Sequence, residues 1–337
     1  MKRAFDLAML GTGFVSPNPR VGAVIVFDNK IIGEGWYEKD GGPHAEVNAV
    51  NNVSSKNKKY LRKSTIYVSL EPCCIFGRTP PCTDLIIKEK IPKVVISIMD
   101  QTDGVKGNGL QQLQNAGVEI KTGVLKNLGT KISQYRNHFV SENRPYVILK
   151  YAQSKDGFMA KEGEQVWLSN KFSKRLVHKW RNELDAIIVG TNTVRIDNPK
   201  LTNRLFFGKS PLRIVLDRNL TLSNNSFLFD DSVPTWIITS QHSLPSNKKN
   251  TVYHYLPFNE LLFPSILKLL ADYGCTTLMV EGGAKLLQTV LKSDLWDEIR
   301  ILENNEILEN GIKAPLIFAK EFEMILDNKL KFIKKNP

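Results

Sequence analysis

The chain contains 337 residues, 42% of them hydrophobic, which predicts two domains with ordinary hydrophobic cores. With 46 basic and 34 acidic residues its net charge is +12, which suggests an anionic partner such as a phosphorylated metabolite, a dinucleotide or RNA, although we expect most of the excess to be spread over the surface. There is no basic stretch interleaved with aromatic residues and no apolar run of membrane-spanning length, so the composition argues against nucleic-acid binding and membrane insertion.

The start of the chain shows no export signal. Met1-Lys2-Arg3 precedes apolar residues, but Asp6 interrupts them and no small-residue cleavage site follows. The chain has four cysteines, three of them between residues 73 and 82, which is not a disulfide framework for a chain of this length. We therefore expect a soluble protein of the reducing cytoplasm.

The first half of the chain alternates between helical and strand patterns. We predict helices over residues 2–11, 44–51, 82–90 and 109–116, and strands over residues 21–27, 30–36, 65–70, 93–99 and 118–120. Strands and helices that alternate in this way predict a three-layer α/β domain.

A polar segment that ends in a proline, residues 137–145, predicts the boundary between domains of residues 1–142 and 143–337. Beyond it we predict strands over residues 146–152, 186–190, 212–217, 235–239 and 277–281, helices over residues 261–273 and 284–291, and a short edge strand over residues 330–333. The second half is therefore also expected to be α/β. We find no internal repeats.

Residues 44–82 contain the ligand set of a zinc site that activates water. His44, Cys73 and Cys82 supply three ligands, which leaves the fourth position open as hydrolytic chemistry requires. Glu46 is two residues from His44, and in mid-helix the two would face different sides. Both reach one ion if it lies beyond the helix N-terminus, where residues 41–43 provide a break. Zinc would lower the pKa of water to roughly 7, and Glu46 would take the proton and deliver it to a leaving amine.

A closed, structural zinc site is the alternative, with Cys74 as its fourth ligand. Adjacent side chains point apart, so Cys74 is a poor partner for Cys73 on one ion. Cys275 precedes a predicted strand and is expected in the core. The remaining histidines show no ligand spacing and are expected at the surface or in the core: His138, His178, His242 and His254.

Eight residues separate Cys73 from Cys82, unlike the Cys-x-x-Cys spacing of most zinc deaminases. Together with residues 16–22 and 44–47, this run resembles the deaminase half of the bifunctional riboflavin-biosynthesis deaminase/reductases. In the second half, residues 149–157, 190–194, 197–202 and 281–283 resemble the reductase motifs of the same family. The resemblance covers nearly the whole chain and implies a cytidine-deaminase-like domain followed by a dihydrofolate-reductase-like domain.

The resemblance implies that the first domain hydrolyses the 2-amino group of a diaminopyrimidinone carrying a ribosyl phosphate. The positions that match substrate contacts there are Asn18, Tyr37, Arg78 and Asp100, with Arg78 on the phosphate. The second domain would open the ribosyl ring and reduce C1′ with NADPH to a ribityl chain. Its cofactor positions are Ala152, Trp167, Thr193, Asp197, Gly283, Ala284, Lys285, Leu286, Leu287, Gln288 and Thr289. Its substrate positions are Gln165, Arg181, Leu201, Arg204 and Glu281.

The chain departs from the family pattern at three places near the first site. Tyr37 stands where the family usually has histidine, Asn48 replaces a frequent second histidine, and residues 101–103 replace Pro-Asn-Pro after Asp100. We expect retuned substrate binding. Two other functions stay open: a cytidine or tRNA-adenosine deaminase with a basic appended domain, and a protein in which one half has lost its activity. A homo-oligomer is compatible with the sequence.

Overall fold

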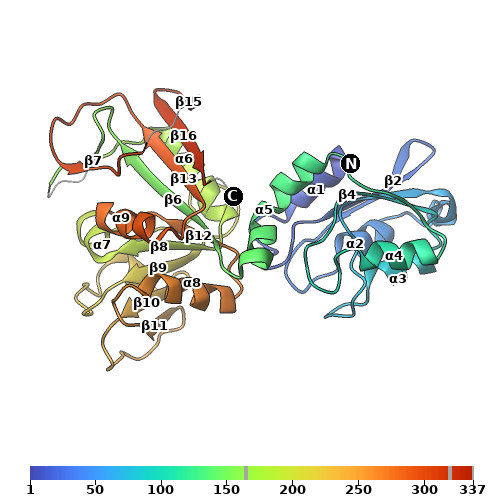
Figure 1. Cartoon of the computed structure of the whole chain (residues 1–337), viewed down its shortest axis with the longest axis horizontal. Helices are drawn as coiled ribbons and strands as arrows, with labels where there is room; N and C mark the ends of the chain where they lie inside the picture. The colour runs from blue at the N-terminus through green and yellow to red at the C-terminus, as the bar shows by residue number, and fades with distance from the viewer. Residues whose placement is uncertain (163–165, 318–320, 336–337) are drawn as a thin grey trace. The chain divides into compact units, whose positions relative to one another are not determined.

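The computed structural model describes residues 1–162, 166–317 and 321–335. The chain divides into two units, Met1–Asn143 and Arg144–Pro337. Each unit has its own sheet (Figure 1), and each has its own hydrophobic core.

Unit 1, whose residues are all described, is built on a five-stranded sheet in the order β2-β1-β3-β4-β5. Its strands are β1 (Gly22–Phe27), β2 (Lys30–Trp36), β3 (Thr65–Leu70), β4 (Lys93–Ile98) and β5 (Glu119–Lys121). Its helices are α1 (Lys2–Leu10), α2 (Ala45–Asn51), the 3-10 helix η1 (Lys58–Lys63), α3 (Cys82–Lys88), α4 (Asn108–Asn115) and α5 (Lys126–Glu142). Strand β1 is antiparallel to both neighbours, and β3, β4 and β5 are parallel.

Alternation along β1 creates the two buried faces of this sheet. Ala23 and Ile25 pack with residues of α2, α3 and α4, whereas Val24 packs with Ala4 and Leu7 of α1. Helices therefore cover both faces, and the predicted three-layer architecture is confirmed.

Helix α5 was not predicted from the sequence, and the polar segment that begins at residue 137 lies partly inside it. Its buried residues are Gly129 and Ser133, so it lacks the apolar stripe that a helix usually shows. Gly129 packs against β4, because a Cβ there would lie 2.3 Å from the Ser97 hydroxyl oxygen. Because small residues make the close contacts of α5, the hydrophobic pattern of the sequence does not indicate a helix here.

In the described part of unit 2, nine strands form one sheet in the order β11-β10-β9-β8-β12-β6-β13-β16-β15, and β14 pairs with β7. The strands are β6 (Tyr146–Gln153), β7 (Phe158–Ala160), β8 (Ala186–Gly190), β9 (Leu212–Leu216), β10 (Thr235–Thr239), β11 (Thr251–Tyr255), β12 (Thr277–Val280), β13 (Glu298–Glu303), β14 (Ile312–Lys313), β15 (Glu323–Ile325) and β16 (Asn328–Lys334). The helices are α6 (Lys171–Glu183), α7 (Thr191–Asp197), the 3-10 helix η2 (Phe227–Phe229), α8 (Leu262–Asp272) and α9 (Ala284–Ser293).

The seven neighbouring strands β11, β10, β9, β8, β12, β6 and β13 of the large sheet run parallel. Strand β16 pairs antiparallel with β13, and β15 pairs antiparallel with β16. The prediction of an edge strand over residues 330–333 is wrong in one respect, because β15 pairs with the outer side of β16. Helices α8 and α9 pack on the apolar core through Phe263, Ile266 and Leu287. On α6, Trp180 packs against Arg300 and Phe332, from β13 and β16.

Several elements of unit 2 were not predicted, and two of them, β13 and α6, bury charged or polar residues. All six residues of β13 are buried, including Glu298, Arg300 and Glu303. The buried face of α6 includes His178, Arg181 and Asn182.

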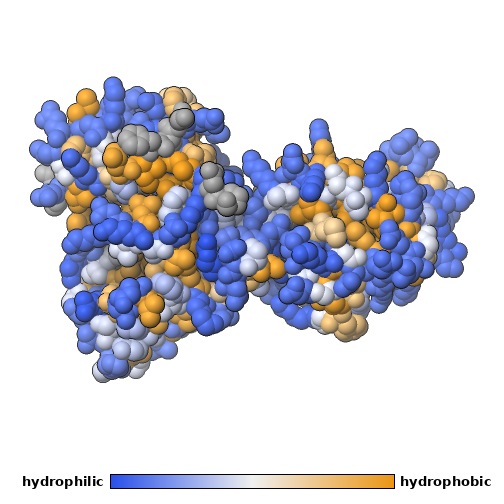
Figure 2. Space-filling view, viewed as in Figure 1, coloured by the Kyte–Doolittle hydropathy of each residue, from blue (hydrophilic) through white to orange (hydrophobic). Residues whose placement is uncertain are grey.

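Hydrophilic side chains cover most of the face seen in Figure 2. Among the described helices none is long and apolar enough to cross a membrane.

Candidate active sites

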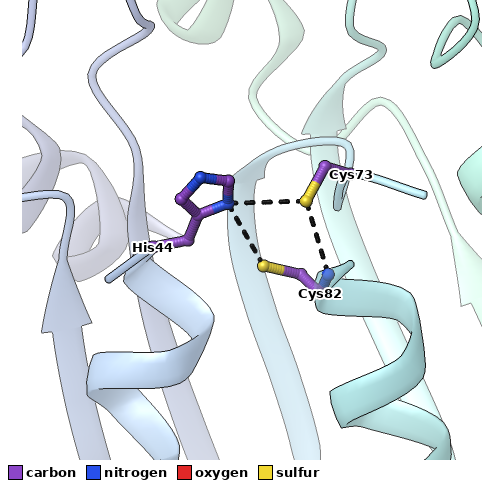
Figure 3. Close-up of side chains that lie close together, drawn as sticks. All are labelled: His44, Cys73 and Cys82. Carbon is purple, nitrogen blue, oxygen red and sulfur yellow. Dashed lines mark hydrogen bonds between the residues drawn. The ribbon is translucent and has the colours of Figure 1, made fainter. Parts of the chain in front are cut away.

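The three predicted metal ligands lie together at two helix N-termini of unit 1. His44 is the N-cap of α2, Cys82 is the first residue of α3, and Cys73 lies in the loop after β3 (Figure 3). The Nδ1 atom of His44 is 3.4 Å from the sulfur of Cys73 and 3.4 Å from that of Cys82. Because His44 precedes the first helical turn, its ring lies beyond the helix end, as the spacing to Glu46 requires.

This geometry fits a zinc ion. The three donor atoms all lie within 4.8 Å of one another. A tetrahedral site with ordinary Zn–S and Zn–N bonds separates its donors by about 3.6–3.8 Å, close to the distances seen here. Within the described residues no fourth His, Cys, Asp or Glu joins the group, so its composition is that of a catalytic site with an open position.

The other two cysteines lie outside this group. The Cys74 thiol donates a hydrogen bond to the carbonyl oxygen of Gly104 at 3.5 Å, so it points to a different loop from Cys73. This contact argues against a closed four-ligand site. Cys275 is 5% exposed and belongs to the core of unit 2, as predicted.

Glu46 lies in the first turn of α2 and is 3% exposed. Burial, and then the negative charge of Cys73, raise the pKa of its carboxyl group to about 7. The Cys82 thiol hydrogen-bonds to Cys73, which lowers the pKa of the Cys73 thiol to about 4 although burial opposes the change. The lowered pKa favours the thiolate form of Cys73, and the buried Glu46 carboxyl group lies close to it, a position that suits general acid/base work.

Three of the four predicted substrate residues of unit 1 form one cluster around Asp40. The Asn18 amide donates to Asp40 Oδ1 at 2.7 Å and to the Tyr37 hydroxyl at 3.2 Å. The Arg78 guanidinium donates to both Asp40 oxygens, at 3.0 and 3.1 Å. The Tyr37 ring packs edge-on against the His44 ring, with centroids 5.4 Å apart. The cluster therefore adjoins the metal ligands.

The fourth residue, Asp100, lies on a loop held by Glu71. Glu71 is 3% exposed and accepts backbone N–H groups from Gly107 at 3.0 Å, from Gly109 at 3.1 Å and from Asp100 at 3.2 Å. The Asp100 carboxylate accepts from the Thr102 amide at 2.8 Å and its hydroxyl at 2.6 Å. Glu71 was not predicted, although its place two residues before Cys73 is a signal for a residue that orders the metal loop.

In unit 2, Glu281 follows the end of β12 and forms ion pairs with two cationic side chains. Lys150 Nζ donates to Glu281 Oε1 at 2.8 Å, and Arg181 Nη2 donates to Oε2 at 3.0 Å. Burial would raise the pKa of Glu281, but the positive charges of Arg181 and Lys150 outweigh it and lower that pKa to about 2. Glu281 is therefore an ionised acceptor at neutral pH. Lys150 was not predicted, although a lysine inside the apolar strand β6 is a signal for a buried functional charge.

Two more predicted residues lie near Glu281 or its partner Arg181. Burial and the Glu281 charge raise the pKa of Asp197. Burial and the charge of Arg181 lower the pKa of Arg204, so the two guanidinium groups lie close enough to repel each other. Leu201 is 2% exposed. The sequence thus identified residues that tertiary folding brings into one charged cluster.

The predicted cofactor segment forms the start of α9. The N-cap residue Gly283 donates its amide to the Thr193 hydroxyl at 3.0 Å, which joins α9 to α7. Lys285, Gln288 and Thr289 are exposed. The side chain of Leu287 is fully buried in the apolar core, with Leu286 packed against it and Ala284 half-buried. The exposed N-terminus of α9 is the part that suits an anion.

The remaining predicted residues are more scattered. Ala152 follows Lys150 by two positions in β6 and so lies on the same face of the sheet. Trp167 is 64% exposed, with Lys174 Nζ 4.1 Å from its ring centre. Gln165 lies outside the described residues.

Comparison with known proteins covers both units. Residues 1–98 match the cytidine and deoxycytidylate deaminase zinc-binding region, and residues 145–318 match the RibD C-terminal domain. The riboflavin biosynthesis protein RibD of Aquifex aeolicus (strain VF5) is 38% identical over 99% of this chain and 94% of that protein. The RibD protein of Bacillus amyloliquefaciens is 36% identical over 97% of this chain and 89% of that protein.

A crystal structure also matches both units together. That of a diaminohydroxyphosphoribosylaminopyrimidine deaminase/5-amino-6-(5-phosphoribosylamino)uracil reductase from Thermotoga maritima has a TM-score of 0.90 and 35% identity, over 99% of this chain and 97% of that chain. The structure of RibD from Acinetobacter baumannii has a TM-score of 0.85 and 30% identity, over 99% of this chain and 98% of that chain. Single proteins therefore match the chain from end to end.

Proposed function

This chain belongs to the RibD family of bifunctional riboflavin-biosynthesis deaminase/reductases, and we propose which of its residues carry the two reactions. The first is hydrolysis of the amino group of a diaminopyrimidinone ribosyl phosphate, and the second is reduction of the ribosyl group with NADPH. The alternative of a cytidine or tRNA-adenosine deaminase with a basic appended domain has no support from relatives that share both units.

In unit 1, His44, Cys73 and Cys82 would hold zinc, and Glu46 would move the protons. When bound, zinc supplies an activated water for hydrolysis. The buried Glu46 carboxyl group would take a proton from the attacking water and pass it to the leaving amine, so that a C–O bond replaces the C–N bond and the products are a carbonyl group and ammonia. The observation that supports this assignment is the convergence of the three donor atoms within 4.8 Å at the N-terminal ends of α2 and α3.

Arg78 is the residue that we assign to the substrate phosphate in unit 1. Its partner Asp40 is at the surface, with side-chain exposures of 67% for Arg78 and 37% for Asp40. An exposed pair of this kind contributes little stability, so a phosphate dianion can take the place of the Asp40 carboxylate on the guanidinium group. Tyr37 and Asn18 then lie between Arg78 and the metal ligands, where the pyrimidine would bind.

In unit 2, Glu281 holds ribose hydroxyl groups, and Arg204 holds the substrate phosphate. Glu281 is kept ionised by Lys150 and Arg181, so it is a strong acceptor. Arg204 donates to the Thr202 hydroxyl at 2.7 Å, and no ion pair to it is found in the described part of unit 2. Arg204, Arg181 and Lys150 give this cluster three cationic side chains against the carboxyl groups of Glu281 and Asp197, which leaves positive charge for a phosphate.

NADPH, when bound, supplies the hydride for C1′, and we assign its phosphate to the N-terminus of α9. A Cβ at Gly283 would come within 3.3 Å of the Thr193 hydroxyl oxygen, so glycine allows α7 and α9 to approach each other closely. Gly283 and Lys285 at the start of α9 are exposed, and a helix N-terminus with a lysine beside it suits a phosphate group.

One experiment tests both activities, including the possibility that one unit has lost its reaction. The purified protein is given the diaminopyrimidinone ribosyl phosphate and NADPH, and ammonia release and NADPH oxidation are followed together. Ammonia release without NADPH oxidation would show an inactive reductase unit. The absence of both signals would contradict the proposal.

The phosphate assignments are tested by Arg78→Ala and Arg204→Ala. Each should raise KM for its own reaction by about tenfold or more, since a charge-assisted hydrogen bond is removed. Matched controls are Arg62→Ala in η1 and Arg175→Ala in α6, which remove exposed arginines of the same units. A KM unchanged from wild type would place the phosphate elsewhere.

A further inference from the structure

Helix α6 presents three buried polar side chains on one face. His178, Arg181 and Asn182 are 5%, 9% and 6% exposed, and their spacing places them on neighbouring turns of the same side. Arg181 reaches Glu281, but His178 and Asn182 have no part in the assignments above. Buried polar groups of this kind need partners, and here the partners lie in one loop.

That loop, residues 202–209, carries Arg204, and α6 binds its backbone at three points. The bonds run from Arg181 Nη1 to the Thr202 carbonyl oxygen at 3.2 Å, from the Arg204 amide to His178 Nδ1 at 2.9 Å, and from the Lys209 amide to Asn182 Oδ1 at 2.9 Å. The middle bond is made by Arg204 itself. The position of its main chain is therefore set by a histidine that lies 26 residues earlier in the sequence.

The chemistry of His178 makes it a steady acceptor. Its Nδ1 accepts the Arg204 N–H, so this nitrogen carries no proton. Burial, followed by the positive charges of Arg181 and Arg204, lowers the pKa of His178 to about 4. The ring is therefore neutral at neutral pH, and a neutral ring adds no further positive charge beside the two arginines.

Gly208 lets the far end of the loop approach the helix closely. Its φ is +123°, and a Cβ at this position would lie 1.7 Å from Asn182 Oδ1. The left-handed conformation and the missing side chain both favour glycine here. The loop is thus fixed on both sides of Arg204.

We propose that His178 is a positioning residue of the reductase site, which holds the backbone of Arg204 so that its guanidinium group meets the substrate phosphate. This inference rests on the proposed role of Arg204. Without the His178 acceptor, the loop would still be attached at Thr202 and Lys209, but the Arg204 amide would lose its hydrogen-bond partner. The main chain from which the Arg204 guanidinium group extends would then no longer be held in one position.

The test compares His178→Leu, His178→Asn, Arg204→Ala and the double variant His178→Leu/Arg204→Ala in the full chain. KM and kcat are measured with 5-amino-6-(5-phosphoribosylamino)uracil added directly, and NADPH affinity is measured by titration. His178→Leu should raise the substrate KM about tenfold. This is the scale expected when the hydrogen bond between the Arg204 guanidinium group and the substrate phosphate is lost. The Asn side-chain oxygen can replace Nδ1 as acceptor, so His178→Asn should stay within about threefold of wild type.

The double variant should be no worse than Arg204→Ala alone, because both changes remove the same interaction. NADPH affinity should be unchanged in all four variants. If Arg204→Ala leaves KM unchanged, the phosphate assignment fails and the inference fails with it. If Arg204→Ala raises KM but His178→Leu does not, the inference alone is overturned. Equal losses in His178→Leu and His178→Asn, with weaker NADPH binding, would show a general structural role and overturn it too.

Gly208→Ala tests the loop without changing the buried histidine. The added Cβ must displace the loop or Asn182, so the substrate KM should again rise about tenfold while NADPH affinity is kept. A wild-type KM in this variant would show that the position of the loop does not control the phosphate site.

Discussion

Replacing Glu281 by glutamine should destabilise unit 2 as well as impair reduction. The change removes the carboxylate that lies 2.8 Å from Lys150 and 3.0 Å from Arg181, and it leaves two cations facing a neutral amide. The side chains of the three residues are 10–16% exposed, so solvent screens their charges poorly. Breaking a buried ion pair by removing one partner is strongly destabilising.

The size of the effect follows from the pKa of Glu281. Folding lowers that pKa from its ordinary value of 4.5 to about 2, which corresponds to about 3 kcal/mol of stability near neutral pH. For a unit of this size a loss of about 3 kcal/mol should lower Tm by about 6–12 °C. Because the folded pKa is the lower one, the stabilisation is present above pH 4.5 and is lost as the pH falls through about 2.

Calorimetry of the full chain measures this loss of stability as a lower Tm for the unfolding transition of unit 2. The difference between wild type and Glu281→Gln should be largest near neutral pH and should narrow as the pH falls below about 4.5. Glu183→Gln is the matched control. Its partner Lys179 is 44% exposed on the same helix, and surface pairs of this spacing contribute about 0.3–0.5 kcal/mol. Equal stability of wild type and Glu281→Gln near neutral pH, or a gap independent of pH, would refute the reasoning.

Three further predictions concern the metal site and the independence of the units. Glu46→Gln should keep zinc but slow ammonia release by about 10² or more, and near-normal release from a zinc-replete variant would contradict the proton-transfer role. Cys74→Ser should keep zinc and deamination whereas Cys73→Ser loses both, so equal metal loss in the two variants, measured by metal analysis, would indicate a closed structural site. A fragment of residues 144–337, which keeps the partly buried ion pair between Arg144 and Asp297, should reduce the deaminated substrate without zinc; an insoluble fragment would show that its core does not suffice alone.

The sequence by itself predicted the metal site, because that site depends on residue type and local spacing. Three donors and a carboxylate are encoded within residues 44–82, and local sequence places His44 and Cys82 at helix starts, although the fold of unit 1 brings them together with Cys73. The resemblance also predicted site roles for Glu281, Arg181 and Arg204, which lie close together in unit 2. Strong strand patterns such as that of β4, whose residues are mostly apolar, predicted most of the sheet.

The tertiary structure decided what surrounds those residues. Lys150 and Glu281 are 131 residues apart in the sequence, and they meet because β6 and β12 pair in parallel at a register set by packing. The contact between His178 and Arg204 depends likewise on how α6 docks beside the loop. Elements such as α5 and β13 escaped prediction because small or charged residues form their buried faces. Local patterns report which side chains avoid water, but long-range pairing determines which charges face each other inside the fold, and a single sequence carries no local signal for that pairing.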